Sequence, residues 1–288
     1  MHNLKSIREN TDTFKKKIFN RNVNLNLNEL LNLDKKNRDL IQKKESLEKE
    51  KKDISKSKDE SLFKKSKKIS LDLESLTKDQ AQVKSKLDSI LSSIPNIPLS
   101  DVPIGKDETS NKEVKKFGTI PNFNFEPKSH YEIGEKLNML DFNLATKTTG
   151  SRFVFVKDKL ATLERALANF MIDVHTQTNG YKEISPPLMA SDSSMFGTGQ
   201  LPKFENDQFE VKLDEKNDRK FLIPTAEVIL TNMVRDQIFK INDLPMRLVA
   251  ATPCFRKEAG SYGKDTKGMI RQHQFYKVEL VSIVENDK

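Results

Sequence analysis

The chain has 288 residues, of which 35% are hydrophobic and 32% are charged, with a formal net charge of +8. This length allows two ordinary domains, while no apolar run approaches the roughly 20 residues of a membrane span. The N-terminus also lacks the apolar core of a signal peptide. A single cysteine, Cys254, excludes a disulfide within the chain, and the four histidines are too scattered to suggest a metal site. These features predict a cytoplasmic protein with no membrane partner.

The positive charge is concentrated at the N-terminal end. Residues 1–100 contain 23 Lys+Arg and 15 Asp+Glu, a net of +8, so residues 101–288 hold the remaining 27 and 27, a net of zero. A basic element beside a neutral body indicates a polyanionic partner, with nucleic acid as the first candidate. The alternative is that lysine-rich helices simply keep this region in solution.

Residues 27–94 show a heptad pattern in two registers, separated by the polar stretch 55–61. The first register contains Leu33, Leu40, Leu47 and Ile54, and the second contains Leu62, Ile69, Leu76, Val83 and Ile90. Two heptad segments joined by a short polar turn predict an antiparallel helical hairpin. Each helix would be roughly 45 Å long. A coiled coil that dimerises two chains fits the same pattern.

Prolines at positions 95, 98 and 103 end the helical region, because proline cannot continue the hydrogen-bond ladder. We therefore expect a helical region over residues 1–100, a linker over 101–130 and a globular domain over 131–288.

The globular region mixes helices and strands. A helix is expected over 160–178, with Leu163, Leu167 and Phe170 on its apolar face, and a second helix over 226–239. Runs rich in β-branched and aromatic residues predict strands. These runs are residues 152–156, 220–224, 246–255 and 274–284. Since strands outnumber helices without alternating with them, the pattern favours an α+β fold with a mainly antiparallel sheet.

Several long phrases resemble one family, the bacterial-type seryl-tRNA synthetases, over essentially the whole chain. These are LKSIREN at 4–10, IPNIPLSDVPIGKDE at 94–108, GTGQLPKF at 197–204, IPTAEV at 223–228 and CFRKEAGSYGKDTKGMIRQHQF at 254–275. The resemblance implies a class II aminoacyl-tRNA synthetase domain that follows a tRNA-binding coiled-coil arm. It also implies a homodimer, with Pro186 and Pro187 in the class motif that builds the interface.

The implied activity is that of a serine–tRNA ligase. Such an enzyme activates L-serine with ATP and Mg²⁺ to seryl-adenylate, then transfers the seryl group to tRNA(Ser), and also to tRNA(Sec). Adenylate formation depends on positioning and on neutralising charge at the phosphates. The resemblance implies ATP-binding roles for Arg256, Lys257, Glu258, Arg271 and Phe275, with Arg256 and Arg271 as the catalytic pair. Phe275 would stack on adenine, although without the resemblance it would be assigned to the core.

For serine, the resemblance implies contacts from Thr225, Ala226, Glu227, Arg256 and Glu279. A structural alternative exists for the first three residues, because a threonine at the start of a helix is also a common cap. A site that hydrogen-bonds the substrate hydroxyl would reject alanine.

The arm and one loop are expected to contact tRNA. On the arm we expect Lys43, Lys44 and Lys51 to bind phosphates, although Lys44 and Lys51 also occupy seam positions of the first heptad register. The glycine-rich, basic segment 259–270 is typical of a loop that closes on the acceptor end, with Tyr262 and Lys264 as contacts.

The family's third class-defining motif, with its ATP-binding arginine and the acidic metal ligands before it, would lie beyond residue 288. We therefore expect residues 1–288 to be C-terminally incomplete and inactive alone. Two alternatives follow. One is a catalytically inactive truncated product or paralogue that binds tRNA. The other is a purely structural coiled-coil protein, which the TAE and FRKE phrases argue against.

Overall fold

The computed structural model describes residues 2–57, 59–213, 218–259 and 267–285. The chain divides into two compact units, residues 1–119 (unit 1) and 120–288 (unit 2). The predicted domain boundaries at residues 100 and 130 stay predictions, since compactness alone does not separate a linker from a domain.

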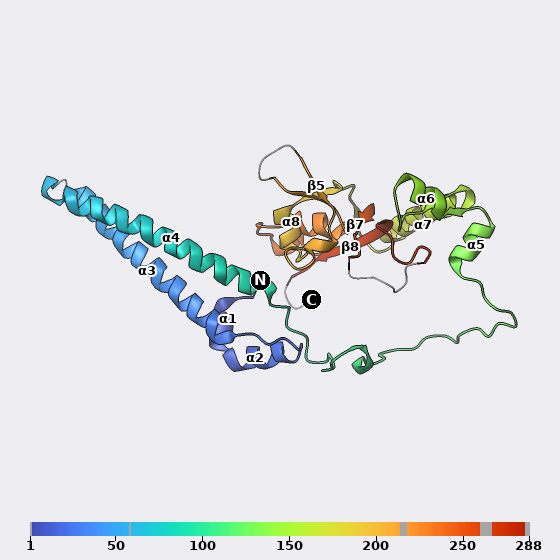
Figure 1. Cartoon of the computed structure of the whole chain (residues 1–288), viewed down its shortest axis with the longest axis horizontal. Helices are drawn as coiled ribbons and strands as arrows, with labels where there is room; N and C mark the ends of the chain where they lie inside the picture. Colours follow the sequence, from blue (N-terminus) through green and yellow to red (C-terminus); the bar gives the residue numbers. More distant parts are fainter. Residues whose placement is uncertain (1, 58, 214–217, 260–266, 286–288) are drawn as a thin grey trace. The chain divides into compact units, whose positions relative to one another are not determined.

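Unit 1 contains a long antiparallel helical hairpin (Figure 1). Its two helices are α3, Leu27–Ser57, and α4, Phe63–Ser93, and the short helix η1, Glu60–Leu62, lies in the connection. Gln80 Nε2 donates to Asn37 Oδ1 at 3.0 Å, and Lys65 Nζ lies 2.7 Å from Glu50 Oε1. The predicted hairpin within one chain is confirmed, although α3 extends three residues into the stretch 55–61 that was expected to form the turn.

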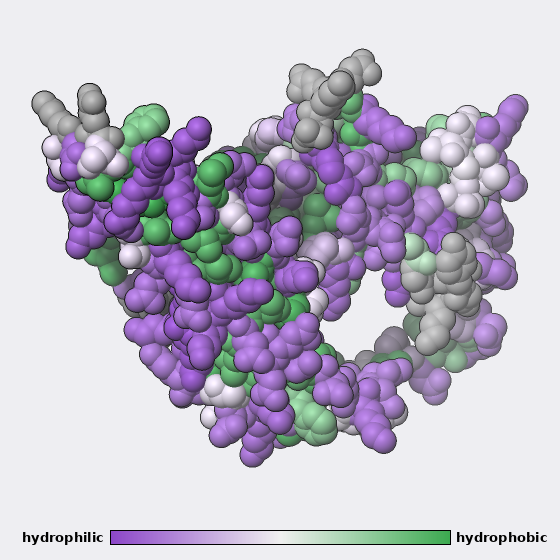
Figure 2. Space-filling view, turned by 60° about the vertical axis from the view of Figure 1, so that its left-hand side comes forward, coloured by the Kyte–Doolittle hydropathy of each residue, from purple (hydrophilic) through white to green (hydrophobic). Residues whose placement is uncertain are grey.

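The heptad pattern explains the pairing of these helices. Leu40, Ile69, Val83 and Leu87 are buried along the seam, because a period of 3.5 residues keeps one side of each helix facing the other. Most other positions are polar and exposed, and hydrophilic side chains cover much of the molecular face in Figure 2. The helices are therefore held by a narrow apolar seam inside a solvated surface.

Two short helices at the base of the hairpin did not follow from the heptad analysis. They are α1, Leu4–Glu9, which Asn3 caps by accepting from two backbone N–H groups, and α2, Thr11–Phe19. Their buried side chains form one core with the ends of α3 and α4. That core contains Ile7, Phe14, Ile18, Leu27, Leu30, Leu87, Leu91 and Ile94. Unit 1 thus has its main hydrophobic core at the base.

A buried carboxylate also joins α1 to α3. Asp34 is 2% exposed, and its oxygens accept from Arg8 Nη1 at 2.9 and 3.1 Å and from Arg38 Nε at 3.1 Å. Because a buried charge must be paired, these two arginines satisfy Asp34 and fix the angle between the helices.

Unit 2 is built around small sheets. The order in the largest described sheet is β3–β7–β8, with β3 parallel to β7 and β7 antiparallel to β8. A second sheet has the order β4–β6–β5, and β1 pairs with β2. The strands are β1 Leu140–Asp141, β2 Phe155–Val156, β3 Lys182–Glu183, β4 Met189–Ser191, β5 Glu210–Val211, β6 Lys220–Leu222, β7 Met246–Phe255 and β8 Gln274–Ile283. The predicted α+β class with mainly antiparallel pairing is confirmed.

Short helices connect and cover these strands. The helices are α5 His130–Lys136, α6 Phe142–Thr148, α7 Asp158–Gln177, α8 Asp192–Gly197 and α9 Glu227–Asn232, with 3-10 turns η3 Glu205–Asp207 and η4 Ile241–Asp243. The turn η2, Glu108–Ser110, belongs to unit 1. In one core, Ala226 and Leu230 pack against Leu248 and Ala250, so α9 lies on β7. Within the described ranges, no helix combines the length and hydrophobicity needed to cross a membrane.

Two sequence-based expectations were partly wrong. The helix expected over 226–239 ends at Asn232, whose side chain donates to the carbonyls of Val228 and Ser194, and Asp236 has a φ of 58° that a helix does not allow. The strand expected over 152–156 is limited to β2, because Arg152 has a φ of 63°, outside the strand region.

Candidate functional site

One face of the β7–β8 pair carries Phe275, which was predicted to bind ATP, and Glu279, which was predicted to bind serine. In the antiparallel register, Ala250 lies opposite Glu279, Thr252 opposite Lys277, and Cys254 opposite Phe275. Residues directly opposite each other share a face of a sheet. We call this set of six residues the site face.

Arg256 lies directly after β7. Its backbone N–H donates to His273 O at 2.9 Å, and its Nε donates to Pro224 O at 3.2 Å. The guanidinium carbon lies 5.2 Å from the centre of the Phe275 ring, within cation–π range. The planar cation and the aromatic face are thus held together at one end of the site face.

Glu258 and Arg271 form an ion pair beyond the ends of the two strands. Arg271 Nη1 donates to Glu258 Oε2 at 3.0 Å, and Arg152 Nη1 donates to Glu258 O at 3.0 Å. Glu258 has a φ of 51°, which is uncommon for a residue with a side chain and is concentrated at functional sites. Two arginines from distant segments hold this strained residue.

A pocket opens beside Arg256 and Glu258. It is also lined by Gln200, Phe204, Asp207, Gln208 and Pro224. Among the residues that the structure describes, Gln208 Oε1 and Arg271 Nε are buried polar atoms without a hydrogen-bond partner. Buried polar groups are normally paired, so the unpaired amide oxygen of Gln208, which lines this pocket, is suited to a polar ligand.

Lys257 is held differently from its neighbours. Its backbone N–H donates to Asp207 O at 2.8 Å, and its Nζ lies 5.7 Å from the centre of the Phe209 ring. Asp207 Oδ1 also accepts from the Ala259 backbone N–H at 2.8 Å. Asp207 therefore anchors the segment after β7, and the side chain of Lys257 extends toward Phe209.

The segment Thr225–Ala226–Glu227 forms the turn between β6 and α9, as its sequence predicted. Thr225 and Ala226 are buried and Glu227 is exposed. Thr225 Oγ1 accepts from the Glu227 backbone N–H at 3.3 Å, but Ala226 is the N-cap of α9 and no side chain caps this helix. The hydroxyl of Thr225 also donates to Glu279 Oε2, which connects the turn to the site face. Thr225 is therefore not the helix cap considered from the sequence.

Glu279, Thr225 and Lys277 form a compact polar group on the site face. Lys277 Nζ donates to Thr225 Oγ1 at 3.1 Å and forms an ion pair with Glu279 Oε2. The Glu279 side chain is 14% exposed and that of Lys277 is 34% exposed. A carboxylate, a hydroxyl and an ammonium group can together bind a small zwitterion.

Cys254 lies opposite Phe275, at the Arg256 end of the site face. It is fully buried, and burial raises the pKa of its thiol. The thiol therefore stays protonated at neutral pH, and its sulfur contributes packing to the site face.

The three predicted tRNA contacts on the arm all lie on α3. Lys43 is exposed on α3, while Lys44 and Lys51 are half-buried beside the seam, where their stems can cover apolar side chains. Tyr262 and Lys264 lie outside the described residues.

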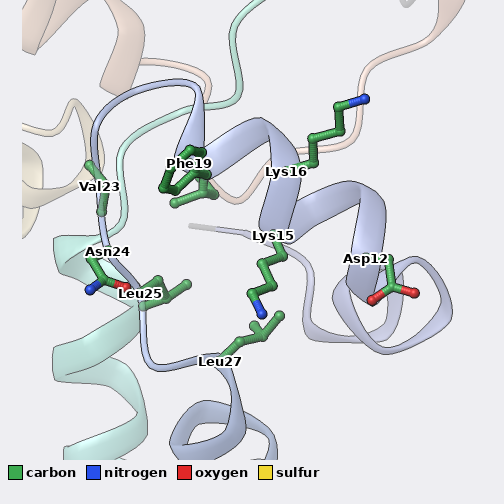
Figure 3. Close-up of a pocket in the computed structure, with 9 residues that line it drawn as sticks. Asp12, Lys15, Lys16, Phe19, Val23, Asn24, Leu25 and Leu27 are labelled. Carbon is green, nitrogen blue, oxygen red and sulfur yellow. The ribbon is translucent and has the colours of Figure 1, made fainter. Parts of the chain in front are cut away.

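Unit 1 contains a separate pocket between α2 and the segment that precedes α3 (Figure 3). Apolar side chains, including Phe19, Val23, Leu25 and Leu27, form much of its wall, and Lys16 extends away from it. Asp12, Lys15 and Asn24 also line this pocket. The pocket in unit 2 contains Arg256 and Glu258, two of the residues predicted to bind ATP, so it is the stronger candidate for nucleotide binding.

Several residues of the site were missed by sequence reasoning. Lys277 is two residues before Glu279, and the period of two along a strand would have placed both on one face. Asp207, Gln200 and Phe204 come from other segments of the chain. Gln200 and Phe204 belong to the phrase GTGQLPKF at 197–204, which indicated the family without indicating their position.

Comparison with known families divides the chain into two regions that resemble the two structural units. Residues 1–98 match the seryl-tRNA synthetase N-terminal domain, and residues 208–288 match the tRNA synthetase class II core domain (G, H, P, S and T). The two matches correspond to the helical arm with its base and to the segment that carries the site face.

Individual relatives agree with these matches. The chain is 71% identical to a serine–tRNA ligase from Pelagibacter ubique over all 288 residues, which is 69% of that protein, and 44% identical to one from Brucella canis over 99% of this chain and 68% of that protein. A seryl-tRNA synthetase from Pyrococcus horikoshii, solved with ATP, aligns with a TM-score of 0.82 and 31% identity, over 98% of this chain and 69% of that chain. A cytoplasmic serine–tRNA ligase from Naegleria fowleri, solved with AMP, aligns with a TM-score of 0.80 and 27% identity, over 97% and 64%.

Proposed function

The chain belongs to the seryl-tRNA synthetase family, the class II aminoacyl-tRNA ligases that use ATP to join serine to its tRNA, and we propose that the site face binds both ATP and serine. One observation carries this proposal. Phe275, beside the guanidinium of Arg256, lies at one end of the site face, and Glu279, hydrogen-bonded to Thr225, lies at the other. At 71% identity to a serine–tRNA ligase, an inactive tRNA-binding paralogue is not favoured.

ATP would lie at the Arg256 end. The guanidinium of Arg256 offers a planar set of donors for α-phosphate oxygens, and Phe275 offers a ring face for adenine. The Glu258 carboxylate would accept from the adenine amino group, and Arg271, already paired with Glu258, would face the phosphates. Lys257 remains a predicted ATP contact, although its side chain lies over Phe209.

Serine would lie at the Glu279 end. Glu279 is acidic and largely buried, so it can accept from the serine ammonium or hydroxyl group. Thr225, Ala226 and Glu227 form the neighbouring turn, and Arg256 would approach the serine carboxylate from the ATP side. A buried acceptor for the hydroxyl group would be left unpaired by alanine, which explains how the site discriminates against it.

The reaction follows from this arrangement. A serine carboxylate oxygen attacks the α-phosphorus of ATP, the bond to the β-phosphate oxygen breaks, and pyrophosphate leaves. A hydroxyl group of the terminal tRNA ribose then attacks the seryl carbonyl, and AMP leaves. The chain's residues contribute by positioning the reactants and neutralising charge, without a covalent enzyme intermediate.

Mg²⁺ enters the proposal as an ion carried by ATP. Within the described ranges, no group of three or more His, Cys, Asp or Glu side chains could hold a metal, and Glu258 is paired with Arg271. These residues do not form a dedicated metal site. Mg²⁺ in nucleotide enzymes is held largely by phosphates and water, with few protein ligands, and none of the steps above is assigned to it.

The arm is proposed as the tRNA-binding element. All of the net charge of +8 belongs to residues 1–100, and the exposed surface of α3 and α4 presents many lysines. Lys43, Lys44 and Lys51 would contact phosphates, whose geometry is read as shape more than as sequence. Tyr262 and Lys264 remain predicted contacts with the acceptor end, and tRNA(Sec) remains a predicted second substrate.

The homodimer and the cytoplasmic location are also proposals. On α7, Leu163, Leu167, Phe170 and Met171 are between 43% and 63% exposed, so the apolar face expected over 160–178 lies at the surface of unit 2. A contiguous exposed apolar face is typical of an interface, and Leu188 and Met189, next to Pro186 and Pro187, are exposed as well. The cytoplasm is the compartment in which an enzyme acting on tRNA would meet its substrate.

The test replaces the proposed serine ligand in the protein at its full natural length. We expect Glu279→Ala to raise the KM for serine in ATP–pyrophosphate exchange by about tenfold to 100-fold, while the KM for ATP changes less than about threefold. Glu285→Ala, on the segment that follows β8, is the control. Serine kinetics within about twofold of the wild type would refute the assignment of this end to serine.

A further inference from the structure

A lysine that none of the predicted roles includes lies in the middle of the site face. Phe275, Lys277 and Glu279 alternate along β8 and point to the same side. Alternate residues of a strand are about 6.6–6.8 Å apart. Lys277 therefore lies between the residue proposed for adenine and the residue proposed for serine, the region where the serine carboxylate and the α-phosphate must meet.

The present partners of Lys277 are groups that serine itself would use. Its Nζ donates to Thr225 Oγ1 at 3.1 Å and pairs with Glu279 Oε2. Thr225 is only 3% exposed, and the Glu279 side chain is 14% exposed, so an unpaired carboxylate here would be costly. An ammonium group from the protein thus satisfies the carboxylate that a substrate ammonium would also seek.

Serine carries both an ammonium and a carboxylate group, so its binding can change the partners of Lys277 and Glu279. The serine ammonium can replace Lys277 on Glu279, because both are cations with hydrogen-bond donors. The lysine side chain has four flexible methylene groups, and 34% of it is exposed, so it can turn toward a new partner. The nearest new anion would be the serine carboxylate.

Resting on the proposed function of the site face, we propose that Lys277 is a serine-binding catalytic residue that exchanges partners. In the empty site it neutralises Glu279. With serine bound, it holds the serine carboxylate beside the α-phosphate and offsets the repulsion between two anions as they approach. No proton is transferred by Lys277, and the bonds formed and broken are those of adenylate formation itself.

A purely structural role predicts a different behaviour. If Lys277 only held Glu279 in place, its loss would weaken every ligand that uses Glu279, whether or not that ligand has a carboxylate. Serinamide separates the two cases, because it keeps the ammonium and hydroxyl groups of serine and has an uncharged amide instead of the carboxylate.

The experiment compares serine and serinamide in the protein at its full natural length. For Lys277→Met, we expect the KM for serine in ATP–pyrophosphate exchange to rise by about tenfold to 100-fold. The inhibition constant of serinamide should change by less than about threefold. Lys277→Arg should recover part of the serine affinity, since it keeps the positive charge. Lys240→Met, an exposed lysine outside the site, is the matched control.

Three outcomes would overturn the proposal. Equal losses of affinity for serine and serinamide would make Lys277 a positioning residue for Glu279. Unchanged serine kinetics in Lys277→Met would remove it from the site. If Lys277→Met failed to fold, as judged by its thermal unfolding, the same comparison would be made with Lys277→Arg, and identical shifts for both ligands would refute the proposal. Failure of the proposed function would look different, since Glu279→Ala would then retain normal serine kinetics.

Discussion

The arm and the site face rely on different kinds of contact. In the arm, the heptad seam brings residues of α3 and α4 together, as with Asn37 and Gln80, and Leu30 and Leu87 belong to the same core at its base. At the site face, Glu279 is contacted by Thr225 from the turn before α9, and Arg256 follows β7, so the site combines separate segments that are held by a few specific bonds. A periodic structure distributes its stability over many equivalent positions, whereas the site depends on individual atoms. The two regions should therefore respond differently to mutation.

The largest expected effect comes from shortening the arm, which should separate tRNA charging from serine activation. Deleting residues 42–75 and joining the ends with a short Gly-Ser loop would keep the Asn37–Gln80 bond and the core at the base, since both lie outside the deletion. We expect tRNA charging to fall by about 100-fold or more, because the phosphate contacts are lost, while serine-dependent pyrophosphate exchange stays within about twofold. Aminoacylation and exchange would be measured side by side.

Single lysine substitutions on the arm should have much smaller effects than the deletion. Lys43→Ala, Lys44→Ala or Lys51→Ala should each lower tRNA affinity by only about twofold to threefold, since the salt-dependent affinity is shared among many phosphate contacts. Unchanged affinity in the shortened arm would contradict a tRNA-binding role. Lost exchange activity would mean instead that the arm supports the catalytic fold.

The next effect tests the core at the base of the arm. Leu87 is 2% exposed, so Leu87→Ala should leave a cavity and destabilise unit 1 by about 2–5 kcal/mol. Leu71→Ala on the same helix is the matched control, because Leu71 is 61% exposed. Hydrogen exchange of the α1–α4 amides in the whole protein would report the difference. Equal protection in the two variants would show that the core at the base contributes little.

A smaller loss is expected from the buried carboxylate. Asp34→Asn removes the charge that Arg8 and Arg38 share, which should destabilise unit 1 by about 1.5–3 kcal/mol. Asp39→Asn, an exposed position on α3, is the control. The same exchange measurement would detect the effect in α1 and α3. Protection unchanged from the wild type would mean that apolar packing alone holds α1 in place.

The smallest effect concerns pH in unit 2. Burial raises the pKa of Cys254, so above the ordinary value of about 8.5 the unfolded state loses its thiol proton before the folded state does. Stability should then fall with rising pH, by up to about 1.4 kcal/mol per pH unit until the folded pKa is reached. Urea denaturation at about pH 7 and about pH 9.5 would show the fall. Cys254→Ala should show a smaller decrease, and an identical decrease would exclude the thiol as its source.

The sequence by itself determined the elements whose signal is local. The heptads predicted both helices of the arm, because the apolar positions of a packed α-helix repeat within every seven residues. The runs at 246–255 and 274–284 predicted β7 and β8 almost to the residue, since long strands of β-branched and aromatic residues have few competing structures. The family phrases indicated the chemistry of the site before any geometry was known.

Tertiary structure decided what depends on distant segments. The end of α9 at Asn232 depends on a bond to Ser194, and the conformation of Glu258 depends on Arg152 and Arg271. The position of Lys277 between Phe275 and Glu279 was readable from strand alternation, but its contact with Thr225 was not, because 52 residues separate the two in sequence. A local pattern records the backbone period, whereas such contacts exist only after the sheet has formed and brought separate segments within hydrogen-bonding distance.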